Sequence, residues 1–229
     1  MLFLLLTVLT FFFIPAWGRT SGRLTSYGQD WAHFPLFAGI AAMLLYVWPR
    51  RRTAVAKAGL VAGLALLIAL LVEMVQPLAG RSATLPDLLI GAAGSLAAVS
   101  VYMGLRTASP QARRGLVATA GLLFLAAALP MLLMLMDRIA AWRAFPLLDS
   151  FERPVESSRW RSDGCQLERV EEHATHGAYA LRLSVPQEPE RYPGAFLNDG
   201  VMDWRGYHQL NLDVFLEGGG ARGLVIRVD

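Results

Sequence analysis

The sequence predicts an α-helical multi-pass membrane bundle of five spans, followed by an all-β sandwich of the jelly-roll kind. Long apolar runs fill residues 1–146, whereas 14 of the 18 acidic residues fall in residues 147–229. The second part also contains short segments in which apolar and polar residues alternate. Averages over the 229 residues, 55% hydrophobic and 17% charged, hide these two regimes. We therefore expect a membrane domain at 1–146 and a β domain at 147–229.

Five apolar runs give the predicted spans, at about residues 1–17, 31–48, 55–77, 85–105 and 116–136. A membrane helix needs about 20 such residues. No basic residue precedes the first run and no Ala-x-Ala cleavage site follows it, so we expect a retained anchor rather than a cleaved signal peptide.

Basic residues in the connections predict the orientation of the spans. The connections after the second and fourth spans carry seven of them, and the alternate connections carry three. Connections rich in Lys and Arg stay in the cytoplasm. The N-terminus is therefore expected inside, with the 73–87 turn and the β domain outside. The seven residues are Arg50, Arg51, Arg52, Lys57, Arg106, Arg113 and Arg114; the three are Arg19, Arg23 and Arg81.

Small residues four apart predict close helix packing. Gly59 and Gly63 form such a pair on the third span, and Gly91 and Ser95 form another on the fourth. Pairs of this kind let helix backbones approach closely. We expect them to pack inside the bundle rather than to form a dimer interface.

Six polar residues gather where the spans reach the outer side, and we predict that they bind a ligand. Glu73 and Gln76 share a helix face inside an apolar segment, where a carboxylate is costly. Glu73 is therefore the one candidate for a catalytic acid or base. No metal site is expected, because the spacing matches no metal-ligand pattern and an arginine is close in sequence. The six are Asp30, His33, Glu73, Gln76, Arg81 and Asp87.

Most of these residues also have a purely structural explanation. Asp87 follows a proline at a helix start, where an acid complements the helix dipole. Asp30 fits a helix cap, Arg81 a neutralising partner and His33 an interfacial residue. Glu73 resists such an explanation, because no helix needs it in order to begin or end.

The order and spacing of these residues resemble the VanZ-like membrane family over about residues 1–136. The resemblance implies a multi-pass protein of the bacterial inner membrane. The family is named for glycopeptide-antibiotic resistance, so a link to such resistance is one expectation. The sequence departs from the family at Ile90-Gly91, where an Asn often precedes the glycine. The residues that carry the resemblance are Asp30-x-x-His33-Phe34, Glu73-x-x-Gln76, Arg81 and Asp87-Leu88-Leu89.

The second part of the chain predicts short strands. Apolar and polar residues alternate at 179–185, 210–216 and 224–228, with Gly and Pro between these segments. This part of the chain also resembles galactose-binding-like, carbohydrate-binding jelly rolls. The residues that carry this resemblance are Phe151-Glu152, Trp160, Tyr192-Pro193-Gly194 and Asp203-Trp204-Arg205-Gly206-Tyr207. Tyr192, Trp204 and Tyr207 are candidates for stacking on sugars, although we favour a core position for Trp204. Because the chain ends at Asp229 directly after a predicted strand, we expect the sandwich to be incomplete.

Composition argues against several kinds of site and partner. The single cysteine, Cys165, allows no intramolecular disulfide and no thiolate metal site, and no cofactor is expected. A net charge of +3 without a basic, aromatic-rich run gives no sign of nucleic-acid binding. The leading hypothesis is binding of an envelope glycan or lipid-linked sugar, with membrane lipids as further partners. The alternatives are a membrane-embedded enzyme acting on such a lipid and a non-catalytic scaffold.

Overall fold

A computed structural model describes residues 23–49, 53–79, 84–186, 193–201, 203–217 and 223–228. Within these ranges it contains five α-helices, a short 3-10 helix and four strands. The chain divides into two compact units, Met1–Ile139 and Ala140–Asp229. We describe each unit by itself.

Four helices of the first unit are long and apolar enough to cross a membrane. They are α2 (Arg23–Val47), α3 (Ala54–Val75), α4 (Leu85–Arg106) and α5 (Pro110–Ala144), and the 3-10 helix η1 (Gln76–Ala79) follows α3. These four helices are compatible with the predicted multi-pass membrane domain. The span predicted at 1–17 lies outside the described residues.

Two helix boundaries differ from the prediction. α2 begins at Arg23 rather than at residue 31, and α5 covers Pro110–Ala144 rather than 116–136. Both extensions contain several polar or charged residues, which interrupt the apolar runs from which the spans were predicted. The structural explanation of Asp30 as a helix cap is therefore wrong, because Asp30 lies inside α2.

Side-chain caps set the starts of three helices. The hydroxyl of Thr53 accepts the Ala56 N–H at the start of α3, and the hydroxyl of Thr84 accepts the Asp87 N–H at the start of α4. Ser109 accepts the Ala112 N–H at the start of α5. Each cap satisfies a backbone donor that the first helical turn leaves without a partner.

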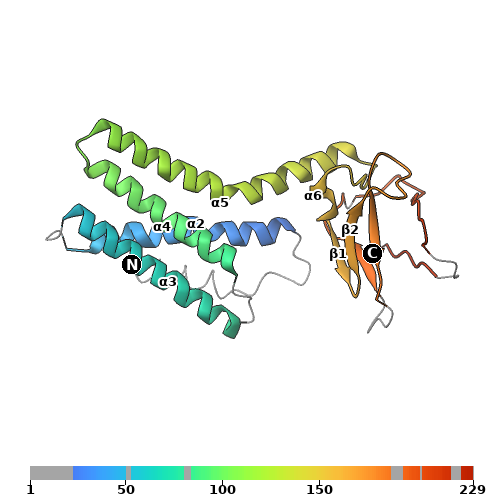
Figure 1. The fold of residues 1–229 in the computed structure, drawn as a ribbon, viewed down its shortest axis with the longest axis horizontal. Coiled ribbons are helices and arrows are strands. Elements are labelled where there is room, and N and C mark those ends of the chain that lie inside the picture. The colour runs from blue at the N-terminus through green and yellow to red at the C-terminus, as the bar shows by residue number, and fades with distance from the viewer. Residues whose placement is uncertain are drawn as a thin grey trace. The chain divides into compact units, whose positions relative to one another are not determined.

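Successive helices run in opposite directions, so that the starts of α2 and α4 lie at the same end as the end of α3 (Figure 1). Their shared core consists mainly of alanine with a few larger side chains. Phe34 packs with Ala97 and Ala120, and Phe37 packs with Ala69. Small side chains allow close approach between membrane helices, where lipid removes the hydrophobic drive for association.

The closest helix contact is between α2 and α4. A Cβ added to Gly94 would lie 2.1 Å from the Phe34 carbonyl oxygen, and one added to Gly91 would lie 2.7 Å from the Phe37 ring. The Ser95 hydroxyl donates to the Gly91 carbonyl at 3.1 Å. The packing predicted for the pair on α4 is thus confirmed.

The packing predicted for Gly59 and Gly63 is not seen among the described residues. Nothing lies within 4 Å of a Cβ added to either glycine in the described structure. The face of α3 that packs is the one carrying Val61, Ala65 and Ala69. A spacing of four shows where two backbones can meet, but it does not show which face of the helix is covered.

Two helices contain an internal proline, Pro35 in α2 and Pro130 in α5. α5 bends partway along its length in Figure 1. A proline removes one backbone hydrogen bond and bends the helix, and membrane helices tolerate this.

The second unit contains the short helix α6 (Pro154–Ser157) and two small antiparallel sheets. β1 (Trp160–Asp163) pairs with β4 (Gly194–Leu197), and β2 (Gln166–Val170) pairs with β3 (Ala180–Ser184). β3 falls in the alternating segment predicted at 179–185. The described residues thus contain a small β region, whereas a complete sandwich is not shown.

The strands predicted at 210–216 and 224–228 are not found, since no described residue there belongs to a strand. Their apolar side chains are exposed, among them Val214 at 60% and Val225 at 89%. Alternation fits a chain to a sheet face, but a strand also needs a neighbour that supplies hydrogen bonds.

Candidate functional site

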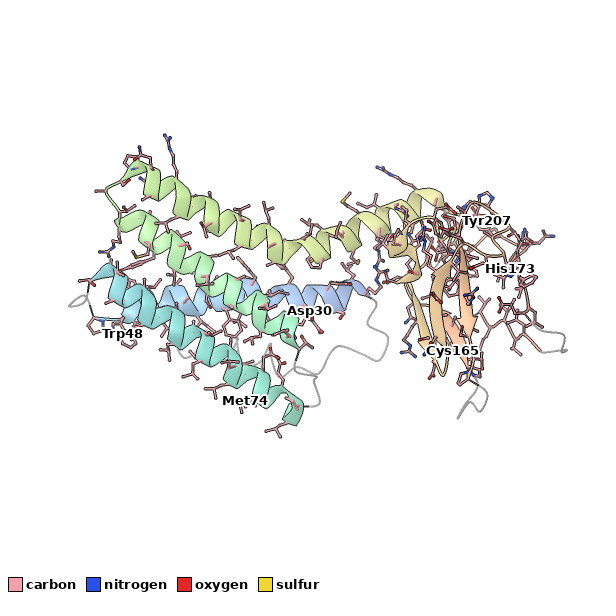
Figure 2. The ribbon with its side chains drawn as sticks, viewed as in Figure 1. Asp30, Trp48, Met74, Cys165, His173 and Tyr207 are labelled. Atoms are coloured by element: carbon pink, nitrogen blue, oxygen red, sulfur yellow. The ribbon has the colours of Figure 1, made fainter. Side chains whose placement is uncertain are left out.

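A buried polar cluster lies where α2, the end of α3 and the start of α4 meet. Its members, which we call the polar cluster, are His33, Glu73, Gln76 and Asp87. Glu73 is 8% exposed and Gln76 3%, whereas Met74 between them is 74% exposed. The polar residues therefore face the helices and the methionine faces outward. Figure 2 labels Met74 at this end of α3 and Trp48 at the opposite end of the unit.

Glu73 ties the end of α3 to the start of α4. Its Oε2 accepts a hydrogen bond from the Thr84 backbone N–H at 3.1 Å, and the Thr84 hydroxyl accepts the Asp87 N–H at 3.2 Å. Thr84 was not among the predicted site residues. Its position three residues before an acid, at the start of an apolar run, is the sequence signal that marks a helix cap.

His33 brings α2 into the same cluster. Its Nδ1 lies 4.0 Å from Oε1 of Glu73, and His33 is 2% exposed. This distance is too long for a hydrogen bond but within the range of an ion pair when the imidazole is protonated. The structure thus brings together two residues that are 40 positions apart in the sequence.

Gln76 and Asp87 hold buried polar atoms that lack a hydrogen-bond partner among the described residues. These atoms are Oε1 and Nε2 of Gln76 and Oδ1 of Asp87. Both residues are 3% exposed. Leaving such a group buried and unsatisfied costs about 1–3 kcal/mol, so natural structures rarely do so without a reason.

Of the other two predicted site residues, the structure describes only Asp30. Asp30, labelled in Figure 2, is half-buried inside α2 and lies three residues before His33. Arg81 lies outside the described residues. Among the residues that the structure describes, no group of three His, Cys, Asp or Glu side chains could hold a metal ion.

A second buried ion pair of this unit had no sequence signal. Asp137 of α5 is 4% exposed and lies 3.6 Å from Nη1 of Arg23 in α2. Neither the spacing nor the local pattern of these residues indicates their contact.

The aromatic candidates of the second unit differ in exposure. Tyr207 is 50% exposed and packs edge-on against Phe145, with 5.0 Å between ring centres. Trp204 is half-buried, and its indole N–H donates to the Val201 carbonyl. Tyr192 lies outside the described residues.

Charged pairs stabilise the second unit. Arg159 and Asp149 form a 2.8 Å pair in which each side chain is only 2% exposed, and the Trp160 indole N–H donates to Asp149 at 2.7 Å. Burial alone would raise the pKa of Glu156. The hydrogen bond and positive charge of Arg153, the Ser150 hydroxyl and the charge of Arg159 outweigh burial, so the pKa of Glu156 lies below its ordinary 4.5.

Comparison with known proteins gives no relative: the chain matches no protein-family model, no curated protein and no solved structure. The function must therefore be argued from the polar cluster itself.

Proposed function

We propose that this chain is a multi-pass membrane protein that binds the sugar-bearing headgroup of an envelope amphiphile at the polar cluster. The observation that carries the proposal is the set of buried atoms on Gln76 and Asp87 that have no hydrogen-bond partner among the described residues. A bound headgroup would supply the missing partners.

Sugar hydroxyls match the hydrogen-bonding needs of these atoms. The Gln76 amide needs both a donor and an acceptor, and the Asp87 carboxylate needs a donor. Each hydroxyl can donate and accept, so neighbouring hydroxyls of one ring can serve both side chains. The cluster also sits at the end of helices that are apolar enough to cross a membrane, where the headgroup of an amphiphile would lie.

From the sequence, we further propose a VanZ-like architecture of five spans, with residues 1–17 as the first span. We also propose that the polar cluster faces outward and that the β domain is an extracytoplasmic jelly roll. The loop charges support the orientation. The two small sheets of the second unit are compatible with a jelly roll. The proposed location is the bacterial inner membrane, and a role in glycopeptide resistance would follow from binding a cell-wall precursor.

A second candidate function is catalysis on the same amphiphile. The buried His33–Glu73 pair favours it, because an imidazole and a carboxylate within 4.0 Å can exchange a proton with a substrate. Turnover of the amphiphile separates the two functions. An enzyme turns it over as the wild type and loses turnover but not affinity in Glu73→Gln, whereas a binding protein shows affinity without turnover in both.

The test is ligand-induced thermal stabilisation in a detergent without sugar groups. A glycolipid should raise the melting temperature of the wild type, and a phospholipid with the same acyl chains should not. Ligand at 100 times its Kd adds about 2.7 kcal/mol of stability. Gln76→Leu should abolish the shift, whereas Gln111→Leu, a control at an exposed position, should keep it. Equal stabilisation by both lipids would overturn the proposal.

A further inference from the structure

Four cations cluster at the end of the helices opposite to the polar cluster. We call this region the basic end and define it by Lys57, Arg106, Arg113 and Arg114. Lys57 and Arg106 lie over the same ring of Tyr102, at 5.8 Å and 5.3 Å from its centre. Arg113 belongs to the same region, because a Cβ added to Gly104 would lie 3.7 Å from its carbonyl oxygen.

No carboxylate near this end in the sequence compensates these charges. Residues 38–72 and 88–136 contain neither Asp nor Glu. Lys57 donates to the Trp48 carbonyl at 2.9 Å, so it has a structural role. Arg113 and Arg114 have neither an ion pair nor a hydrogen bond through their side chains among the described residues.

The position of Arg113 and Arg114 makes their charges unfavourable for the helix itself. α5 begins at Pro110 and has no acid in its first turn. The start of a helix carries the positive end of its dipole, which repels cations. An anion from outside the chain would remove this repulsion.

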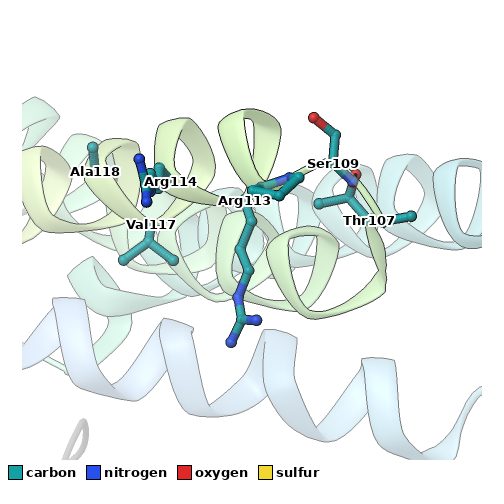
Figure 3. Close-up of a pocket in the computed structure, with 8 residues that line it drawn as sticks. Thr107, Ser109, Arg113, Arg114, Val117 and Ala118 are labelled. Carbon is teal, nitrogen blue, oxygen red and sulfur yellow. Dashed lines mark hydrogen bonds between the residues drawn. The ribbon is translucent and has the colours of Figure 1, made fainter.

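A pocket opens beside these two arginines, with a volume of about 580 Å³. Thr107, Ser109 and the arginines provide polar lining, and Val117 and Ala118 provide apolar lining. Figure 3 shows Arg113 and Arg114 on the same turn of α5 with their side chains directed differently. Beyond the pocket the surface of α5 continues with exposed Leu122 and Leu125, at 67% and 56%.

We propose that this pocket binds the headgroup of an anionic phospholipid. The exposed side chains of Arg113 and Arg114 turn toward each other and bind the phosphate with their guanidinium groups, and the acyl chains follow the apolar side of α5. Arginine is well suited to phosphate because its planar group donates two hydrogen bonds at once. The apolar lining that continues along α5 distinguishes a lipid from a soluble phosphate.

The experiment uses the full chain in zwitterionic nanodiscs that contain increasing fractions of phosphatidylglycerol. Bound phosphatidylglycerol is counted by native mass spectrometry after release. The wild type should retain phosphatidylglycerol in preference to phosphatidylcholine. The double variant Arg113→Gln/Arg114→Gln should bind it about 10- to 30-fold more weakly, because each cation near an anionic surface contributes about fivefold.

Two controls make the outcome decisive. Arg138→Gln/Arg143→Gln removes two exposed arginines from the far part of α5 and should leave binding unchanged. Inorganic phosphate should neither compete with the lipid nor raise the melting temperature. The proposal fails if both double variants lose binding equally, if phosphatidylcholine binds as well, or if inorganic phosphate reproduces the effect.

Discussion

At the scale of single residues, Glu73 faces two neighbouring helices with its two carboxylate oxygens. One oxygen accepts the Thr84 N–H at the start of α4, and the other lies 4.0 Å from Nδ1 of His33 in α2. A residue that only held α4 in place would need just the first contact. The second contact, with His33, is the one that the proposed catalysis would use.

Substitutions of Glu73 should separate these two contacts. Glu73→Gln keeps an oxygen acceptor for Thr84, so the melting temperature in detergent should change little. Glu73→Leu removes the acceptor and leaves a buried N–H unsatisfied, which should cost about 1–3 kcal/mol. Met74→Leu, at an exposed neighbouring position, is the control. Equal melting temperatures for Glu73→Leu and the control would show that the contact with Thr84 contributes nothing.

Glu156 gives the second unit a dependence on acid. Because the pKa of Glu156 is lowered in the folded protein, its ionised form stabilises the fold above the unfolded pKa. This stability should be lost as the pH falls from about 4.5 through the folded pKa.

The measurement is amide hydrogen exchange of residues 149–170 in the full chain, corrected for intrinsic rates. Protection should fall at acid pH in the wild type and in Glu171→Gln, an exposed control, but stay level in Glu156→Gln. A wild-type profile that does not depend on pH would contradict this role.

At the scale of elements, the contact between α2 and α4 positions His33 relative to the start of α4. It depends on Gly94, whose Hα side faces the Phe34 carbonyl directly. No side chain fits there without moving a helix backbone.

Alanine substitutions should reveal this contact. Gly94→Ala should destabilise the protein by about 1–3 kcal/mol, because overpacking forces a backbone shift. Gly59→Ala places the same methyl group in open space and should stabilise α3 by about 0.5–1 kcal/mol through helix propensity. Thermal melts of both variants in one detergent provide the comparison. A loss of stability in Gly59→Ala equal to that in Gly94→Ala would mean that the exposed face of α3 is also an interface.

The sequence predicted the elements of the first unit better than their faces. Apolar runs identify α3 and α4 to within a residue or two because lipid requires such runs. They miss the start of α2, where polar residues from Arg23 onward are helical as well. They also cannot tell that no described residue covers the Gly59 face of α3, since this depends on where α2 and α4 lie.

The sequence predicts that the polar residues share one end of the helices, but it does not predict the contacts between them. Alternating spans bring the start of α2, the end of α3 and the start of α4 to one side, so His33, Glu73 and Asp87 had to share it. The contact of Glu73 with Thr84 cannot be predicted from residue spacing, because it depends on how the chain connects α3 to α4. In the second unit, alternation at 210–216 predicted a strand, but alternation alone does not supply a pairing partner.

At the scale of the whole molecule, the charge asymmetry of the connections predicts one orientation in the membrane. A reporter that is active only outside the cytoplasm should work when fused after Asp229 and should fail when fused after Arg52. The seven-to-three distribution of basic residues is the physical reason. The opposite pattern of activity would place the polar cluster on the cytoplasmic side and remove an extracytoplasmic ligand from consideration.

The central claim is that the polar cluster holds a sugar-bearing amphiphile. Native mass spectrometry of the full chain, purified in a detergent without sugar groups, tests it most directly. The wild type should carry a co-purifying species whose fragments contain a saccharide, and Gln76→Leu should lose it while Gln111→Leu keeps it. The account is contradicted if the wild type carries no saccharide-containing species, or if Gln76→Leu retains it at the wild-type level.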